Sequence, residues 1–513
     1  MEDAVRVVLE RMHINALANT DICRHALEDT GPSTIDPMDL RLYDTKTSSL
    51  QNLVPIRDGK VGIYLCGPTV QGMPHIGHLR AATSFDVLIR WLRRYGLDIT
   101  YVRNVTDIDD KILAKSAESG EQWWALAQRF EREFQKAYAT LGLIEPTIEP
   151  RATGHITDQI ALVERLIERG HAYADQRGNV YFDVHSQADY GSLTHQSLNQ
   201  MRTTEGEDET EAISAGKRDP RDFALWKSTK EGEPETASWD SPWGLGRPGW
   251  HLECSAMAHR YLGEAFDIHG GGIDLRFPHH ENEQAQSHAA GYDFANLWVH
   301  NAWVTIAGEK MAKSVGNTLD LASLLSQAPA AVIRFALSSV HHRSMIEWSE
   351  TTLELAGKSW DKLAGFVEDA TAQVGEPEVV FMTPDELPAE FTDALNDDLN
   401  VAAGLAVVYD HVKRGRRALV EGDREGIQAE LKVVRSMLDV LGVDPGSPQW
   451  RTTGGDTLQG ALDVMINEVL AERALAREEK DWARADQLRD RLAAAGIQVE
   501  DGPQGVQWQV TAR

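Results

Sequence analysis

The chain has 513 residues, which is too long for one hydrophobic core, so we expect three or more domains. Hydrophobic residues make up 42% and charged residues 25%, and no run approaches the roughly 18 uncharged apolar residues that span a membrane, so we expect a globular protein without a membrane segment. The formal net charge of -28 excludes a protein that coats nucleic acid non-specifically, but an RNA enzyme with basic groups on one face stays open.

The three cysteines, Cys23, Cys66 and Cys254, rule out a disulfide framework and indicate a reducing cytoplasm. Residues 1–37 do not read as a signal peptide, because they lack an apolar core of the right length and carry acidic residues among the basic ones. Met38 stands just before the first strand-like run. We therefore expect residues 1–37, a leader of unknown role, to be dispensable.

A strand, a helix and a second strand follow the leader. Residues 61–65 form a short apolar run typical of a buried strand, apolar residues recur at helical spacing from Ile76 to Gly96, and residues 99–105 predict the next strand. This order implies a right-handed parallel crossover, hence a Rossmann-like α/β domain with an open parallel sheet. Ligands bind such sheets at the carboxyl ends of the strands, here at residues 66–69.

Two histidines mark the predicted start of that helix, in the run from Pro74 to His78. His75 and His78 lie three residues apart on one turn, where unpaired backbone amides already favour anions. Gly77 between them removes side-chain bulk, so a flat ring could lie on the backbone. The run predicts a phosphate site, although two surface histidines beside a helix cap remain an alternative.

An inserted segment, residues 152–240, interrupts the nucleotide-binding domain, which we assign to residues 38–151 and 241–321. Short strand-like pieces occur between Tyr173 and Leu193 and again near Phe223. Residues 203–218 between them are polar and mostly acidic, which is typical of a mobile loop.

Four side chains could hold a metal ion. Cys66 ends the first strand and Cys254 lies in a later helical segment, while His279 and Glu283 are one helical turn apart and can share a ligand point. Two thiolates, one imidazole and one carboxylate form a reasonable zinc set. Two alternatives remain: Cys254 could be a small core residue, and His280 could replace His279.

A lysine-rich run, residues 310–314, precedes a Gly-Asn turn. Lys310 and Lys313 suit a mobile basic loop beside a leaving pyrophosphate, because charge develops there in the transition state. The alternative is an ordinary solvated loop.

After Leu321 the chain is nearly all helical. We expect a helical stem at residues 322–390 and a helical bundle at 391–450, with one apolar face formed by Leu395, Leu399, Ala402 and Ala406. A module at 456–513 should contain a charged helix at about 465–493 and two paired strands that turn at Gly502-Pro503.

Side chains that could contact RNA occur in the predicted helical bundle and in the C-terminal module. Lys413, Arg414, Arg416 and Arg417 form a cluster, and Trp508 could stack on an exposed base. A salt-bridged surface and a core aromatic are the respective alternatives.

Taken together, these motifs resemble known families. The segments 75–78 and 310–314 resemble the HIGH and KMSKS elements of class I aminoacyl-tRNA synthetases, with Ala312 in place of the usual serine. Residues 66–70, 249–257 and 277–283 resemble the cysteinyl-tRNA synthetase family.

The resemblance implies a residue-by-residue site. It assigns one zinc ion per chain to Cys66, Cys254, His279 and Glu283. It places around the bound cysteine Gly67, Thr69, Thr106, Trp250 and His269. It places against ATP Gly271, Gly272, Asp274 and Lys313, and it assigns stabilisation of the transferring phosphates to His75, His78, Lys310 and Lys313.

The same resemblance implies the substrates ATP with Mg²⁺, L-cysteine and tRNA(Cys), with the helical bundle and the C-terminal module gripping the anticodon arm; we expect a monomer. Because zinc prefers thiolate to alkoxide, it could separate cysteine from serine without an editing domain. Two rivals remain: a cysteine ligase of the mycothiol pathway with an amino-sugar acceptor, and a catalytically silent zinc- and RNA-binding module.

Overall fold

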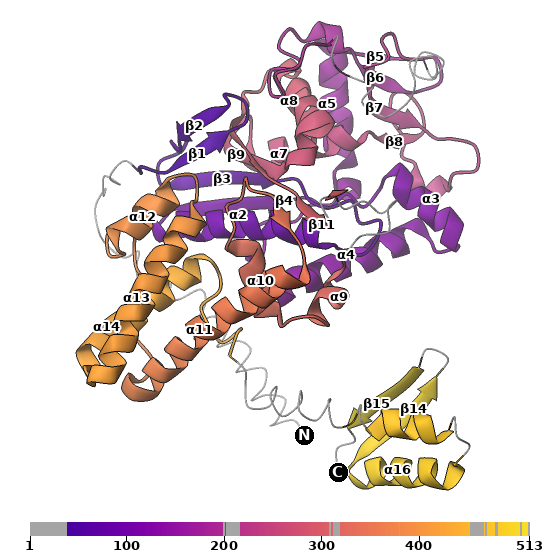
Figure 1. Cartoon of the computed structure of the whole chain (residues 1–513). Helices are drawn as coiled ribbons and strands as arrows, with labels where there is room; N and C mark the ends of the chain where they lie inside the picture. Colours follow the sequence, from indigo (N-terminus) through magenta and orange to yellow (C-terminus); the bar gives the residue numbers. More distant parts are fainter. Residues whose placement is uncertain are drawn as a thin grey trace, which may run out of the picture. The chain divides into compact units, whose positions relative to one another are not determined.

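The computed structural model describes residues 38–198, 201, 216–306, 309–310, 319–378, 380–451, 466, 469–477, 481–502 and 505–510. The chain divides into two compact units, Met1–Asp444 and Pro445–Arg513, and each is described by itself (Figure 1). The predicted leader, residues 1–37, and most of the predicted acidic loop lie outside the described residues.

A four-stranded parallel sheet forms the centre of the first unit, in the order β10-β9-β3-β4. Its strands are β3 (Lys60–Leu65), β4 (Asp98–Arg103), β9 (Ala265–Gly272) and β10 (Phe294–Asn301). Each pair is parallel, with Ile63 opposite Ile268 in β9. The strands are mostly buried, as expected when helices cover both faces. The predicted open α/β sheet is confirmed.

Helix α2 (Ile76–Arg94) connects β3 to β4 as the crossover. Its sequence buries an apolar stripe that includes Leu79, Leu88 and Trp91. The chain turns at Gly96, which has a φ of 72° that favours glycine, so the predicted stop is confirmed.

Further elements surround this sheet. The hairpin of β1 (Arg41–Asp44) and β2 (Ser49–Asn52) lies beside β10, where Thr45 N–H donates to the Trp298 carbonyl at 2.9 Å. The helices of this part are α3 (Asp110–Ser119), α4 (Trp123–Thr140), α7 (Trp250–Leu262) and α8 (Glu281–Ala289).

The inserted segment contains α5 (Ile156–Glu168) and an antiparallel sheet in the order β5-β6-β7-β8. Its strands are β5 (Ala172–Ala174), β6 (Val180–Phe182), β7 (Phe223–Ser228) and β8 (Gly246–Pro248). Because β8 follows residue 240, the sheet continues beyond the segment that we assigned to the insertion. Its core also includes Leu252 of α7 and Ala285 of α8, so the insertion packs directly on the helices of the parallel-sheet domain.

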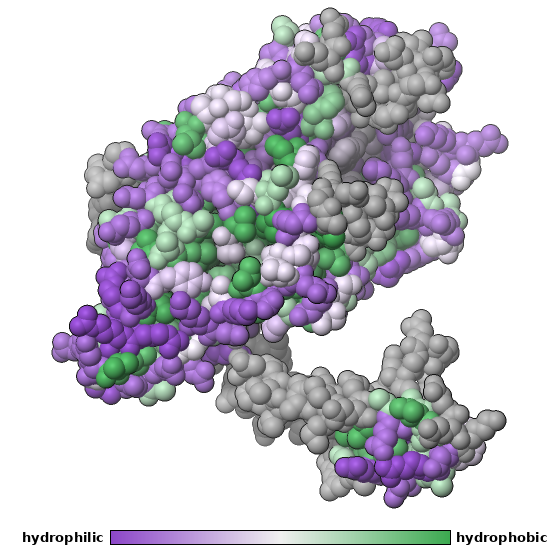
Figure 2. Space-filling model, viewed as in Figure 1, coloured by the Kyte–Doolittle hydropathy of each residue, from purple (hydrophilic) through white to green (hydrophobic). Residues whose placement is uncertain are grey.

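Helices dominate the rest of the first unit. They are α9 (Leu321–Leu325), α10 (Ala330–Ser338), α11 (Glu350–Val374), α12 (Ala389–Asn396), α13 (Val401–Glu421) and α14 (Arg424–Val440). A small sheet of β11 (Val304–Ile306), β12 (Glu309–Lys310) and β13 (Ile346–Glu347) precedes and interrupts them. Figure 2 shows mainly hydrophilic residues over α11, α13 and α14 on the face drawn.

The apolar face predicted for residues 391–410 is partly wrong. Leu395 and Leu399 are buried, but Ala402 and Ala406 are exposed. The helix is interrupted, because Asp398 and Leu399 adopt positive φ angles of 57° and 55° between α12 and α13. This break rotates the following helix, whose buried side consists of Val401, Gly404, Leu405, Val408, His411, Val412, Gly415 and Ala418.

The second unit contains the predicted strand pair, β14 (Ile497–Gly502) and β15 (Gly505–Val510), which run antiparallel. The predicted charged helix is not continuous. A new helix, α16 (Trp482–Ala494), begins after Asp481, whose side chain accepts from Arg484 N–H at 3.0 Å.

Candidate active site

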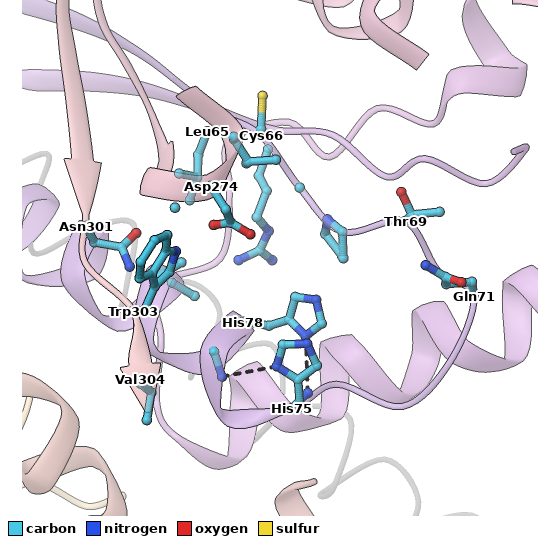
Figure 3. A pocket seen from close by; sticks show the side chains of 18 of the residues that line it. Leu65, Cys66, Thr69, Gln71, His75, His78, Asp274, Asn301, Trp303 and Val304 are labelled. Atoms are coloured by element: carbon cyan, nitrogen blue, oxygen red, sulfur yellow. Dashed lines mark hydrogen bonds between the residues drawn. The ribbon is translucent and has the colours of Figure 1, made fainter. Parts of the chain in front are cut away.

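A cavity of about 380 Å³ lies at the carboxyl ends of β3 and β10 and at the start of α2 (Figure 3). The predicted residues that line it are Cys66, Gly67, Thr69, His75, His78, Trp250, Gly272 and Asp274. Figure 3 shows the Cys66 sulfur on the opposite side of the cavity from the two histidine rings. The sheet therefore brings together segments that are about 200 residues apart in sequence.

His75 and His78 hold each other at the start of α2. His78 Nδ1 accepts from His75 N–H at 3.1 Å, and His75 Nδ1 accepts from Gly77 N–H at 3.2 Å, as the dashed lines in Figure 3 show. The ring centroids are 3.7 Å apart. Because both Nδ1 atoms accept, a neutral ring carries its proton on Nε2. Each ring can thus present an N–H donor.

Two loops that follow β3 and β4 are bound side by side. Gly67 N–H donates to Asn104 Oδ1 at 2.8 Å, and a Cβ atom at this position would lie 1.6 Å from the Asn104 carbonyl oxygen. Only glycine fits there. Thr106 is buried, its N–H donates to the Pro68 carbonyl at 3.2 Å, and its hydroxyl lies 2.8 Å from Glu253 Oε2.

Some predicted residues lie behind the cavity wall rather than on it. Thr106, His269 and Gly271 do not line the cavity, and all three are buried. His269 Nε2 lies 2.9 Å from Glu283 Oε2, so it adjoins the cysteine-rich cluster described next.

The four predicted metal ligands converge. The Cys66 and Cys254 sulfurs are 3.8 Å apart, Cys66 Sγ lies 3.2 Å from Glu283 Oε1, and His279 Nε2 lies 3.0 Å from that same oxygen. One atom from each of the four lies within 4.8 Å of the others. In a tetrahedral site with Zn–S bonds of about 2.3 Å, two sulfurs are about 3.8 Å apart. The donor set fits zinc.

A second set shares two of these residues, Cys66 and Glu283, and adds His269 and His280. His279 and His280 have different partners. His279 Nδ1 lies 2.9 Å from His251 Nδ1, which leaves Nε2 toward Glu283, whereas His280 Nδ1 lies 2.8 Å from His300 Nε2.

Burial sets the protonation of these groups. It raises the pKa of the Cys66 thiol well above its usual value and that of Cys254 to about 11, and it lowers the pKa of His279 to about 3. Burial also acts to raise the pKa of Glu283, but His269 and His279 outweigh it, so that pKa is lowered. The thiols are thus protonated near neutral pH unless a cation lies beside them.

Comparison with known proteins identifies the family. A model of the class I (C) tRNA synthetase catalytic domain matches residues 52–358, a DALR domain matches 390–443, and a cysteinyl-tRNA ligase anticodon-binding domain matches 459–508. The cysteine–tRNA ligase of Beutenbergia cavernae is 59% identical over 92% of this chain and 99% of its own, and that of Paenarthrobacter aurescens is 52% identical over 92% and 99%. The chain belongs to the cysteine–tRNA ligase family.

Solved structures of other synthetases share the fold. Mycobacterium tuberculosis methionyl-tRNA synthetase in complex with methionyl-adenylate superposes with a TM-score of 0.54 at 16% identity, covering 75% of this chain and 90% of that one. A ternary complex of Agrobacterium radiobacter LeuRS gives a TM-score of 0.57 at 10% identity, covering 78% and 86%. At these identities the likeness concerns the fold alone.

The lysine loop expected from family resemblance lies mostly outside the described residues. Only the backbone of Lys310 is described, in β12, and Lys313 falls in the undescribed stretch 311–318. The chain that follows is anchored at the start of α2, since Ile76 N–H donates to the Leu319 carbonyl at 2.9 Å. Leu319 and Asp320 therefore lie beside the start of α2, where Asp320 pairs with His75 in an antiparallel bridge.

Several cavity residues were missed by the sequence interpretation. Arg103 ends β4, Lys111 lies in α3, Asn301 ends β10, and Trp303 follows that strand. The apolar run at residues 297–299 could have predicted β10 as another parallel strand, whose carboxyl end meets the same edge of the sheet.

The predicted RNA-binding cluster on α13 is largely paired with acids. Each of three arginines has a guanidinium nitrogen near a carboxylate oxygen. The distances are 3.4 Å for Arg416 to Asp369, 2.8 Å for Arg417 to Glu421 and 3.9 Å for Arg414 to Glu430. This agrees with the salt-bridged alternative for these arginines. The side chain of Trp508 lies outside the described residues.

Within the part of the chain that the structure describes, we find no helix both long and apolar enough to cross a bilayer.

Proposed function

We propose that this protein activates L-cysteine with ATP and transfers it to tRNA(Cys). The cysteine carboxylate attacks the α-phosphorus of ATP, which yields cysteinyl-adenylate and pyrophosphate. A terminal ribose hydroxyl of the tRNA then takes the acyl group and AMP leaves. The observation that carries this proposal is one cavity that has Cys66, a member of the predicted metal-ligand set, at one side and the imidazoles of His75 and His78 at the other.

One zinc ion would bind the side chain of the amino-acid substrate. Its ligands would be Cys66, Cys254, His279 and Glu283. Of the two overlapping sets, this one supplies both sulfurs and leaves His280 paired with His300. Zinc favours a thiolate ligand over an alkoxide, and this difference would separate cysteine from serine. The 3.8 Å spacing of the two sulfurs supports the assignment.

The residues around the bound cysteine would be Gly67, Thr69, Thr106, Trp250 and His269. Gly67 lets the loop after β3 approach the Asn104 carbonyl closely, and Glu253 fixes the orientation of the Thr106 hydroxyl from behind. Trp250 stacks on His279 with ring centroids 4.2 Å apart, so it can close the cavity next to the metal ligands.

The phosphates of ATP, accompanied by Mg²⁺, would bind at the start of α2. His75 and His78 would donate from Nε2, and Lys310 and Lys313 would approach from the adjoining loop. Gly271, Gly272 and Asp274 would bind the adenosine, since Gly272 and Asp274 line the same cavity.

A protein with these parts is expected in the cytoplasm, where tRNA is charged.

The acceptor separates this function from the amino-sugar ligase. The match to an anticodon-binding domain at residues 459–508 supports tRNA, because a ligase for a small amine has no use for such a domain.

Cysteine-dependent exchange of pyrophosphate into ATP tests the activation step. We expect exchange with cysteine in the absence of tRNA, and exchange with serine lower by a factor of a thousand or more, because roughly a hundredfold is the limit for pockets that use shape alone. Exchange with serine at a comparable rate, or none with cysteine, would contradict the proposal.

A further inference from the structure

The helix that carries Glu283 is held by a loop of the insertion. We call residues 190–194 the strap. Its Gly191 N–H and Thr194 N–H donate to the two carboxylate oxygens of Glu281 at 2.8 and 2.9 Å, and the Thr194 hydroxyl donates to Glu281 at 2.9 Å. The strap thus makes three hydrogen bonds to one side chain of α8.

The strap also contacts the residues on either side of Glu283. The Tyr190 hydroxyl donates to Asn282 Oδ1 at 2.6 Å, and Gln284 Nε2 donates to the Ser192 hydroxyl at 2.8 Å. Three residues of the first turn of α8 are therefore bound to the strap, and the metal-ligating carboxylate lies among them.

Burial makes these contacts necessary. Glu281, Asn282 and Glu283 are 0% exposed. A buried carboxylate that loses its hydrogen-bond donors is strongly destabilised, because no water replaces them. The strap supplies hydrogen-bond partners that this buried turn cannot obtain from water.

The strap is itself fastened on both sides. Tyr190 packs in the core of the insertion, and Leu193 packs in the core of the catalytic part. Gly191 has a φ of 97°, and a Cβ atom there would lie 2.0 Å from the Gln196 carbonyl oxygen, so only glycine permits this turn. Beyond the strap, His195 Nε2 lies 3.0 Å from the Ser48 hydroxyl.

We propose that the strap positions Glu283 for metal binding, and that this is a role of the insertion in the reaction. The inference rests on the zinc assignment made under the proposed function. Thr194 and Glu281 are positioning residues, because they act on the ligand Glu283 through α8. Outer groups that orient metal ligands typically change metal affinity by about 10–100-fold when they are removed.

The rate of zinc release from the zinc-loaded full chain to a colorimetric chelator tests this inference. Thr194→Val removes the hydroxyl donor to Glu281 and should accelerate release about tenfold or more. Thr194→Ser keeps the hydroxyl and should restore the wild-type rate. The matched control is Thr229→Val in the same insertion, whose hydroxyl donates to Ser238 at 2.7 Å, and it should leave release unchanged.

A second measurement needs no metal. Hydrogen exchange of the α8 amides should be faster in zinc-free Thr194→Val than in the zinc-free wild type, and the same should hold for Ser192→Ala if the first variant does not fold. If both variants release zinc and exchange their α8 amide hydrogens at wild-type rates, the positioning role of the strap is wrong, while the zinc assignment is unaffected. A wild-type chain that binds no zinc would overturn the metal assignment as well.

Discussion

At the scale of single residues, Cys254 illustrates how burial and a cation act in opposite directions. The side chain is 1% exposed, and burial raises its thiol pKa to about 11. The buried sulfur is an inert thiol by itself, whereas a divalent cation would favour the thiolate. Burial alone therefore does not tell whether Cys254 is a metal ligand or a small core residue. Metal binding by the protein distinguishes the two.

Cys254→Ser retains the volume of the side chain but replaces the soft ligand. We expect the variant to lose stoichiometric zinc and, with it, at least tenfold in cysteine affinity, measured by metal analysis and by equilibrium binding of cysteine. Cys23→Ser, in the leader, is the matched control and should change neither. Normal cysteine binding by a zinc-free Cys254→Ser protein would refute the assigned ligand set.

The sequence could predict which residues meet at the site, but it could not choose between His279 and His280. The two differ in their tertiary partners, His251 and His300, which come from α7 and β10. Neither partner is implied by local spacing. The same holds for Glu253, whose contact with Thr106 joins segments 147 residues apart.

At the scale of elements, the start of α2 combines a helix cap with the proposed phosphate site. His78→Ala removes the acceptor for His75 N–H and also one Nε2 donor. Losing a cap costs about 1 kcal/mol of stability, whereas losing a preorganised donor costs about a hundredfold or more in rate.

We therefore expect His78→Ala to slow cysteine-dependent pyrophosphate exchange by about a hundredfold, with cysteine affinity nearly unchanged. His185→Ala, which removes an exposed histidine paired with Asp219, is the control and should exchange at the wild-type rate. Unchanged exchange in His78→Ala would show that this histidine is only a cap.

A short apolar run predicted β3, and helical spacing of apolar residues predicted α2, because each element buries its apolar side chains. Helical spacing failed at the junction of α12 and α13, where no glycine or proline signals the break. Asp398 is held there by distant groups: Tyr43 N–H donates to one carboxylate oxygen at 2.8 Å, and Arg343 Nε donates to the other at 2.6 Å. Such tertiary contacts override a helical pattern and shift the buried face.

At the scale of the whole molecule, the proposed active site and the match to an anticodon-binding domain fall in different units. The cavity, the cysteine-rich cluster and the strap all lie within Met1–Asp444, while the anticodon-binding match lies within Pro445–Arg513. All the residues that we propose for adenylate formation belong to the first unit. A chain that ends at Asp444 should therefore retain pyrophosphate exchange but charge tRNA much more weakly than the full chain.

The acceptor of the cysteinyl group tests the central claim most directly. The full chain would be incubated with cysteine, ATP, tRNA(Cys) and a free amino sugar, and the two products would be quantified in the same reaction, with the chain ending at Asp444 as the matched comparison. We predict cysteinyl-tRNA from the full chain, much less of it from the shorter chain, and no amide of the amino sugar. A stable cysteinyl amide of the sugar, with no cysteinyl-tRNA, would contradict the account.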